Sequence, residues 1–148
     1  MEVLGYQKRP ARLEGLQACA AVGQSRLMAV YQELFAAHGT QTAQVLLTHA
    51  DLQDHDRHLN ARNTLVALLA AGVVPVVNEN DAVSFTELTV GDNDKLSALV
   101  AALLPADLLV LLTTVDGLVR NYGKPNAKVI SSVKKIDGPI KKLAGGTQ

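Results

Sequence analysis

Apolar positions along this chain fall into blocks whose spacing predicts strands and helices in alternation. The first long block, residues 13–38, is rich in Ala and Leu and predicts a helix that is interrupted near Gly23 and stops at Gly39. Residues 49–57 are highly charged and are expected to form a loop. Strands are expected at 41–48, 73–78, 83–90, 107–114 and 128–133, and further helices at 58–71, 95–104 and 139–144. This alternation indicates an α/β fold with buried parallel strands.

Two clusters of acidic and amide side chains follow predicted strands. One spans residues 78–81 (NEND) and the other spans residues 91–94 (GDND). Carboxylates accept hydrogen bonds from an ammonium group and amides donate to a carboxylate, so the two clusters together suit a zwitterionic ligand. Ligands in open α/β sheets bind outside the carboxyl ends of the strands, where both clusters are expected to lie. Two solvated turns are the alternative, although an ordinary turn needs only one or two such residues.

The second cluster runs directly into the predicted helix at 95–104. One of Asp92, Asn93 and Asp94 is therefore expected at the N-cap, where a carboxylate also favours the positive end of the helix dipole. Pro105 is expected to end the helix. The sequence thus reads strand, polar loop, helix and strand.

Composition narrows the class of protein without deciding it. The chain has 148 residues, of which 48% are hydrophobic and only 3% aromatic, so its core must consist of aliphatic side chains. Basic and acidic residues balance at 14 each, which argues against nucleic acid or an anionic membrane as partner. No apolar run is long enough to span a bilayer, and residues 1–3 show no signal-peptide design. The single cysteine, Cys19, excludes an internal disulfide, is expected in the core, and suits a cytoplasmic protein.

Several motifs resemble those of the glutamate 5-kinases in the amino acid kinase superfamily. They are AAVGQSRL from Ala20, QVLLT from Gln44, LNARNTL from Leu59, VPVVNENDAV from Val74, VGDNDKLSA from Val90 and LLTTVDGL from Leu111. The resemblance implies a three-layer αβα fold with a mainly parallel sheet, truncated at both ends. It divides the chain into an amino-acid-binding part, residues 1–105, and the beginning of a nucleotide-binding part, residues 106–148.

The same resemblance implies transfer of the γ-phosphoryl group of ATP to the side-chain carboxylate of glutamate, the first step of proline biosynthesis. It implies that Asp81 accepts from the substrate ammonium and that Asn93, with Asn78 near it, holds a carboxylate. Asp92 is a further candidate for substrate binding. Asp94 resembles the catalytic acidic residue that orients active-site lysines around the transferring phosphate. Mg²⁺ would be held mainly by the ATP phosphates, so no residue is assigned as a metal ligand.

Three further assignments follow from the resemblance. Thr113 and Thr114 match the nucleotide-contacting Thr-Asp pair of the family, with Thr in place of the carboxylate at the second position. Asp51 is a candidate for regulation, because this segment borders the glutamate pocket, where proline acts as a feedback inhibitor in the family.

Some motifs of the family are absent from these residues. Neither the Val-Lys-Leu-Gly-Thr-Ser strand nor the Gly-Thr-Gly-Gly-Met loop occurs. The lysines that face the phosphates in the family are therefore absent as well. The chain alone is therefore expected to be inactive, and its unpaired strand edges predict a homo-oligomer, a swapped arrangement or a partner that supplies strands. The alternative function is a non-catalytic amino-acid-binding or oligomerisation module. A third reading, another kinase of the superfamily, is disfavoured by the NENDAV and VGDND strings.

The charged segment before the second predicted helix has the composition of a metal site. A solvated loop is favoured over a metal site there, because no familiar ligand pattern is complete. The residues concerned are His49, Asp51, Asp54, His55, Asp56 and His58.

Overall fold

The computed structural model describes residues 4–83 and 92–144. The chain divides into two compact units, Met1–Leu109 and Val110–Gln148. The elements of the first unit are α1 (Leu13–Ala36), β1 (Gln41–Leu47), α2 (His49–Gln53), α3 (His55–Ala70), β2 (Val73–Glu79) and α4 (Asp92–Leu103). Those of the second are β3 (Val119–Arg120), β4 (Lys128–Val129) and α5 (Gly138–Ala144).

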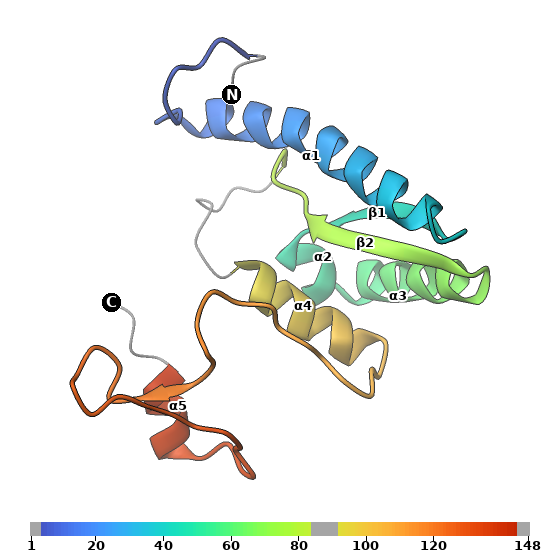
Figure 1. The fold of residues 1–148 in the computed structure, drawn as a ribbon. Helices are drawn as coiled ribbons and strands as arrows, with labels where there is room; N and C mark the ends of the chain where they lie inside the picture. The colour runs from blue at the N-terminus through green and yellow to red at the C-terminus, as the bar shows by residue number, and fades with distance from the viewer. Residues whose placement is uncertain (1–3, 84–91, 145–148) are drawn as a thin grey trace. The chain divides into compact units, whose positions relative to one another are not determined.

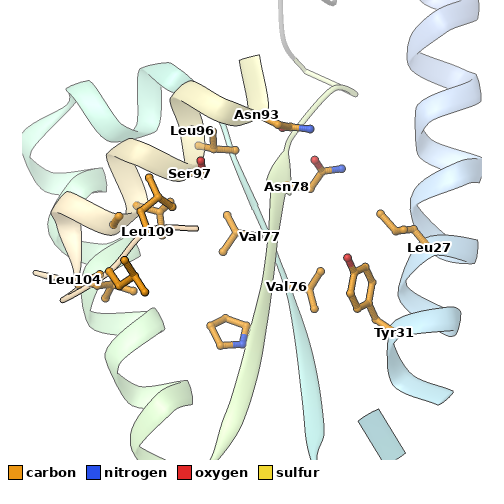
Figure 2. Close-up of a pocket in the computed structure, with 15 residues that line it drawn as sticks. Leu27, Tyr31, Val76, Val77, Asn78, Asn93, Leu96, Ser97, Leu104 and Leu109 are labelled. Atoms are coloured by element: carbon orange, nitrogen blue, oxygen red, sulfur yellow. The ribbon is translucent and has the colours of Figure 1, made fainter. Parts of the chain in front are cut away.

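The first unit has three layers, as Figure 1 shows. Strands β1 and β2 pair in parallel, in a register that runs from Gln41 opposite Val73 to Leu47 opposite Glu79. Helix α1 covers one face of this pair, and α3 and α4 cover the other (Figures 1 and 2). The prediction of an α/β fold with a parallel sheet is confirmed.

Helix α1 runs without a break from Leu13 to Ala36, so the predicted interruption near Gly23 is wrong. A single glycine inside a helix costs only about 1 kcal/mol relative to alanine, which a long run of good helix formers offsets. Gly39 adopts a left-handed φ of 68°, which helps the chain turn from the helix into β1, as predicted.

The predicted loop at 49–57 is helical instead. The Thr48 side chain accepts from the Asp51 N–H, and the Asp51 carboxylate accepts in return from the Thr48 N–H, which forms a capping box for α2. Asp54 caps α3 by accepting from the Arg57 N–H at 2.9 Å. The polar residues that favoured a loop are therefore the ones that start these two helices.

The core of the first unit lies between the sheet and the helices α2, α3 and α4. Its centre is Leu65 of α3, whose side chain is fully buried. The other buried members of the cluster are Leu47, Leu52, Ala61, Leu96 and Leu103. This cluster fixes the positions of β2 and α4, the two elements that carry the polar clusters noted above.

The predicted strand at 107–114 is not a strand in the structure. Its apolar side chains are exposed instead, with Leu108 76% exposed and Leu112 94% exposed. A strand forms only when a neighbour satisfies its backbone groups, and no described segment pairs with this one. The strand predicted at 128–133 is reduced to β4, which pairs antiparallel with β3.

Two further predictions concern the segment that leads into α4. The predicted strand at 83–90 lies almost entirely outside the described residues. Helix α4 begins at Asp92, so Asn93 and Asp94 lie in its first turn rather than at the N-cap. Within the described parts of the chain, no helix is sufficiently long and apolar to cross a membrane.

Candidate amino-acid site

A cavity of about 590 Å³ lies in the first unit between α1, β2, α4 and residues 106–109. Most of its wall is aliphatic, and its polar side chains include Asn78, Asn93 and Ser97 at one end (Figure 2). Its volume lies within the usual range for small-molecule sites, roughly 300–1,000 Å³. Polar groups at one end of an apolar cavity can fix the orientation of a small ligand.

Asn78 and Asn93 bring the two sequence clusters together. Asn78 lies near the carboxyl end of β2 and is half-buried, whereas Asn93 lies in the first turn of α4 and is exposed. Both side chains line the same end of the cavity (Figure 2). This is the arrangement expected when a polar loop follows a strand and leads into a helix.

Gln24 of α1 holds the Asn78 side chain in place. The Nδ2 atom of Asn78 donates to Oε1 of Gln24 at 2.9 Å. The Nε2 atom of Gln24 is buried and, among the described residues, has no hydrogen-bond partner. A buried donor without a partner is costly, and a bound anion or water would satisfy it. Gln24 was not singled out from the sequence, because only the packing of α1 against the sheet brings it to β2.

Asp81 lies at a second, small cavity of about 30 Å³, enough for a water molecule or two. Asp81 is half-buried, and Gln24 contributes to the same wall. Gln24 therefore lines the cavity of Asp81 and also accepts the hydrogen bond from Asn78. Asp94 is exposed and lines neither cavity; its main-chain carbonyl accepts from the Ser97 hydroxyl at 2.7 Å.

Comparison with known proteins identifies the group to which these residues belong. Residues 1–143 match the amino acid kinase family. The chain belongs to that family. It is 52% identical to the glutamate 5-kinase of Myxococcus xanthus over 99% of this chain and 40% of the relative. It is 51% identical to the glutamate 5-kinase of Shewanella amazonensis over 99% of this chain and 39% of the relative. The chain thus spans about two fifths of the length of the curated relatives it matches.

Asp51 has a clear structural role. Its Oδ2 atom accepts from the Thr48 hydroxyl at 2.7 Å and from the Thr48 N–H at 2.8 Å, and its Oδ1 atom accepts from Arg57 at 2.9 Å. The hydrogen bond from the Thr48 side chain is the largest cause that lowers the pKa of Asp51, and the main-chain bond and Arg57 add to it. These contacts place Asp51 in the α2 cap, and its regulatory role stays a prediction.

We expect Asp51→Asn to lower stability by about 1 kcal/mol at neutral pH, as loss of a good cap does. Because the folded-state pKa is depressed, the ionised carboxylate stabilises the fold above its unfolded-state pKa of roughly 3.9, and this contribution is lost as pH falls through the folded-state value. Urea unfolding between about pH 6 and pH 3 should therefore show a weaker pH dependence in the variant. Asp56→Asn is the control, because its carboxylate makes no hydrogen bond or ion pair within the described residues; equal effects of both substitutions would contradict the assignment.

His49 and Glu79 form a pair that was also not predicted. His49 Nδ1 lies 3.4 Å from Glu79 Oε2, and both side chains are largely buried. The two residues lie just after β1 and at the end of β2, so the parallel pairing of the strands brings them together. Across the described residues, no group of three or more His, Cys, Asp or Glu side chains is arranged to hold a metal ion.

The remaining predicted site residues do not line the large cavity, or their side chains lie outside the described part of the structure. Thr113 and Thr114 belong to the second unit and are exposed, and the Thr113 hydroxyl accepts from the Val115 N–H at 3.0 Å in a local turn. Asp92 is the first residue of α4, and its side chain lies outside the described part of the structure. Cys19 is half-buried in α1 rather than in the core.

Proposed function

We propose that this chain carries the amino-acid-binding part of a glutamate 5-kinase. Such an enzyme transfers the γ-phosphoryl group of ATP to the side-chain carboxylate of glutamate, the first step of proline biosynthesis. The observation that carries the proposal is the approach of Asn78 and Asn93, one from each polar cluster, at one end of a cavity in an amino acid kinase chain. The relatives, which are named as glutamate 5-kinases, support the choice of substrate.

Glutamate would be bound by complementary charges and hydrogen bonds. The amides of Asn78 and Asn93 donate to one of its carboxylates, and the buried Nε2 atom of Gln24 is a further donor nearby. Asp81 accepts from the ammonium group, and Asp92 contributes from the second cluster. Hydrogen bonds in which one partner is ionised are about twice as strong as neutral ones, so these contacts suffice for a small polar ligand.

Phosphoryl transfer requires positioning of two anions and neutralisation of their charge. Asp94 is the catalytic candidate, since it stands at the exposed start of α4, where it can orient cations. Mg²⁺ would enter with ATP and be held mainly by its phosphates. Thr113 and Thr114 are the candidates for contact with the nucleotide.

A non-catalytic amino-acid-binding or oligomerisation module is the second candidate. It differs from the first candidate in one respect: it needs neither lysine-bearing string of the family, and residues 1–148 contain neither. Loss of such cations costs several kcal/mol of transition-state stabilisation. We therefore propose that the 148-residue chain alone does not turn over ATP. Proline would be the regulatory ligand in either case, with Asp51 as the candidate regulatory residue.

Calorimetric titration with glutamate, proline and ATP separately tests the proposal. We expect the chain to bind glutamate, and Asn93→Asp to weaken that binding at least tenfold, because a carboxylate would then face the ligand carboxylate. Asn126→Asp, an exposed position in the second unit, is the matched control and should leave the affinity unchanged. Absence of glutamate binding to the wild-type chain would refute the binding role.

A coupled assay of ADP release separates the two candidate functions. The isolated chain is expected to show no glutamate-dependent release of ADP. Turnover that depends on glutamate would overturn the proposed inactivity and support catalysis by residues within this chain.

A further inference from the structure

Gln24 of α1 connects the two cavities of the first unit. It lines the small cavity together with Asp81. Its Oε1 atom accepts at 2.9 Å from Nδ2 of Asn78, which lines the large cavity. The two bonded residues are 54 positions apart in the sequence. The hydrogen bond therefore forms only when α1 packs on β2, and it ties a side chain of the candidate site to the neighbouring helix.

The surroundings of Gln24 favour the direction of this hydrogen bond. Each amide carries both a donor and an acceptor, so Nε2 of Gln24 could instead donate to Oδ1 of Asn78. That arrangement would exchange the positions of Oε1 and Nε2 in Gln24. Glu79 and Asp81 lie on the wall of the small cavity that Gln24 also lines. Ionised carboxylates only accept hydrogen bonds, so they favour the Nε2 donor of Gln24 as a neighbour over its carbonyl oxygen.

The fixed direction prepares Asn78 for a ligand. Its Nδ2 atom is turned toward α1, where Gln24 holds it (Figure 2). One of the two Nδ2 hydrogens is bonded to Gln24, and the other stays available for a ligand carboxylate. A side chain that is already held loses less conformational freedom when the ligand arrives, so the ligand binds more tightly.

Gln24 carries a cost that stability alone does not explain. Its Nε2 atom is buried and has no hydrogen-bond partner among the described residues. A buried donor of this kind destabilises the folded protein, and an apolar side chain of similar length, such as methionine, would avoid that cost. A costly polar group beside a candidate site therefore indicates a role in ligand binding.

We propose that Gln24 is a positioning residue for the amino-acid ligand. It holds the Asn78 amide in one orientation through the hydrogen bond between α1 and β2, so that a glutamate carboxylate meets a donor that is already in place. Gln24 acts through Asn78, and this role therefore rests on the proposed function, in which Asn78 donates to glutamate. It adds to the site a residue of α1 that neither polar cluster of the sequence contains.

A double-mutant cycle in the full chain tests this role by calorimetric titration with glutamate. Gln24→Met keeps the length of the side chain but removes its acceptor, and it is expected to weaken binding by roughly threefold to tenfold, as loss of one pre-ordered side chain does. The same substitution in an Asn78→Ala background should cause little further loss, because the residue through which Gln24 acts is then truncated. Gln32→Met, at an exposed position of the same helix, is the matched control and should leave the affinity unchanged.

A merely structural role of Gln24 would lower the affinity equally with and without the Asn78 amide. Equal losses in the two backgrounds, or an unchanged affinity in Gln24→Met, would overturn the positioning role and leave the proposed function intact. Absence of glutamate binding to the wild-type chain would instead remove the proposed function and this role with it. Circular dichroism verifies folding, and Gln24→Leu decides the matter in the same cycle if Gln24→Met fails to fold.

Discussion

Replacing Leu65 by alanine is expected to lower the free energy of unfolding by about 3 kcal/mol. Leu65 is fully buried in the cluster formed by β1 and the helices α2, α3 and α4. The substitution removes the transfer free energy of the deleted atoms and leaves a cavity that the surrounding helices can fill only in part. Domains of this size are stable by roughly 5–15 kcal/mol, so the loss is a large share of the total. Urea unfolding followed by circular dichroism measures it.

Leu69→Ala is the matched control on the same helix. Leu69 lies one turn after Leu65 and is 49% exposed, so its truncation removes less buried area and leaves no enclosed cavity. Its cost should be below about 1 kcal/mol, partly offset by the higher helix propensity of alanine. Similar losses for Leu65→Ala and Leu69→Ala would show that Leu65 is not the centre of the core.

Elements with strong local signals were predicted within a few residues. Strand β1 was predicted at 41–48 and spans Gln41–Leu47, and β2 was predicted at 73–78 and spans Val73–Glu79. Their apolar runs are bounded by glycine and polar residues, and such boundaries act over a short range. Helix α2 is not evident from composition, because its residues are polar and charged and only its cap indicates a helix. Thr48 and Asp51 have the spacing of a capping box, and this signal was available in the sequence.

The segment at 107–114 shows what an apolar run cannot specify. Its composition is that of a buried strand, but pairing depends on a neighbour that is distant in sequence or in another molecule. The side chains from Leu108 to Leu112 are exposed because no described strand pairs with this segment.

The candidate site was predictable in part for a related reason. Asn78 and Asn93 could be expected to converge, because both lie beside the carboxyl end of β2, one in the strand and one in the helix after it. Gln24 and the His49–Glu79 pair were not found, since their contacts arise from packing between separate elements. Local patterns thus located the strand end, whereas the neighbours of the site required the tertiary structure.

Asp81→Asn is expected to weaken glutamate binding about 100-fold, equivalent to about 2.7 kcal/mol. The proposed role of Asp81 is to accept from the ligand ammonium in a half-buried position beside Gln24. Removal of one partner from a partly desolvated charge pair leaves the other charge without a partner. This commonly costs roughly 2–5 kcal/mol of binding free energy. Asparagine keeps the size of the side chain, so the loss reports the charge. Calorimetric titration with glutamate measures it.

The control for Asp81→Asn must remove the same charge far from the cluster. Asp116→Asn does so at an exposed position of the second unit and should change the affinity less than threefold. Thermal unfolding of both variants separates a binding defect from a folding defect, because Asp81 also has contacts within the fold. If Asp81 contacts the ligand ammonium specifically, only Asp81→Asn should lose affinity, and the variant should remain folded. Equal losses in both variants would assign the effect to net charge and remove Asp81 from the site.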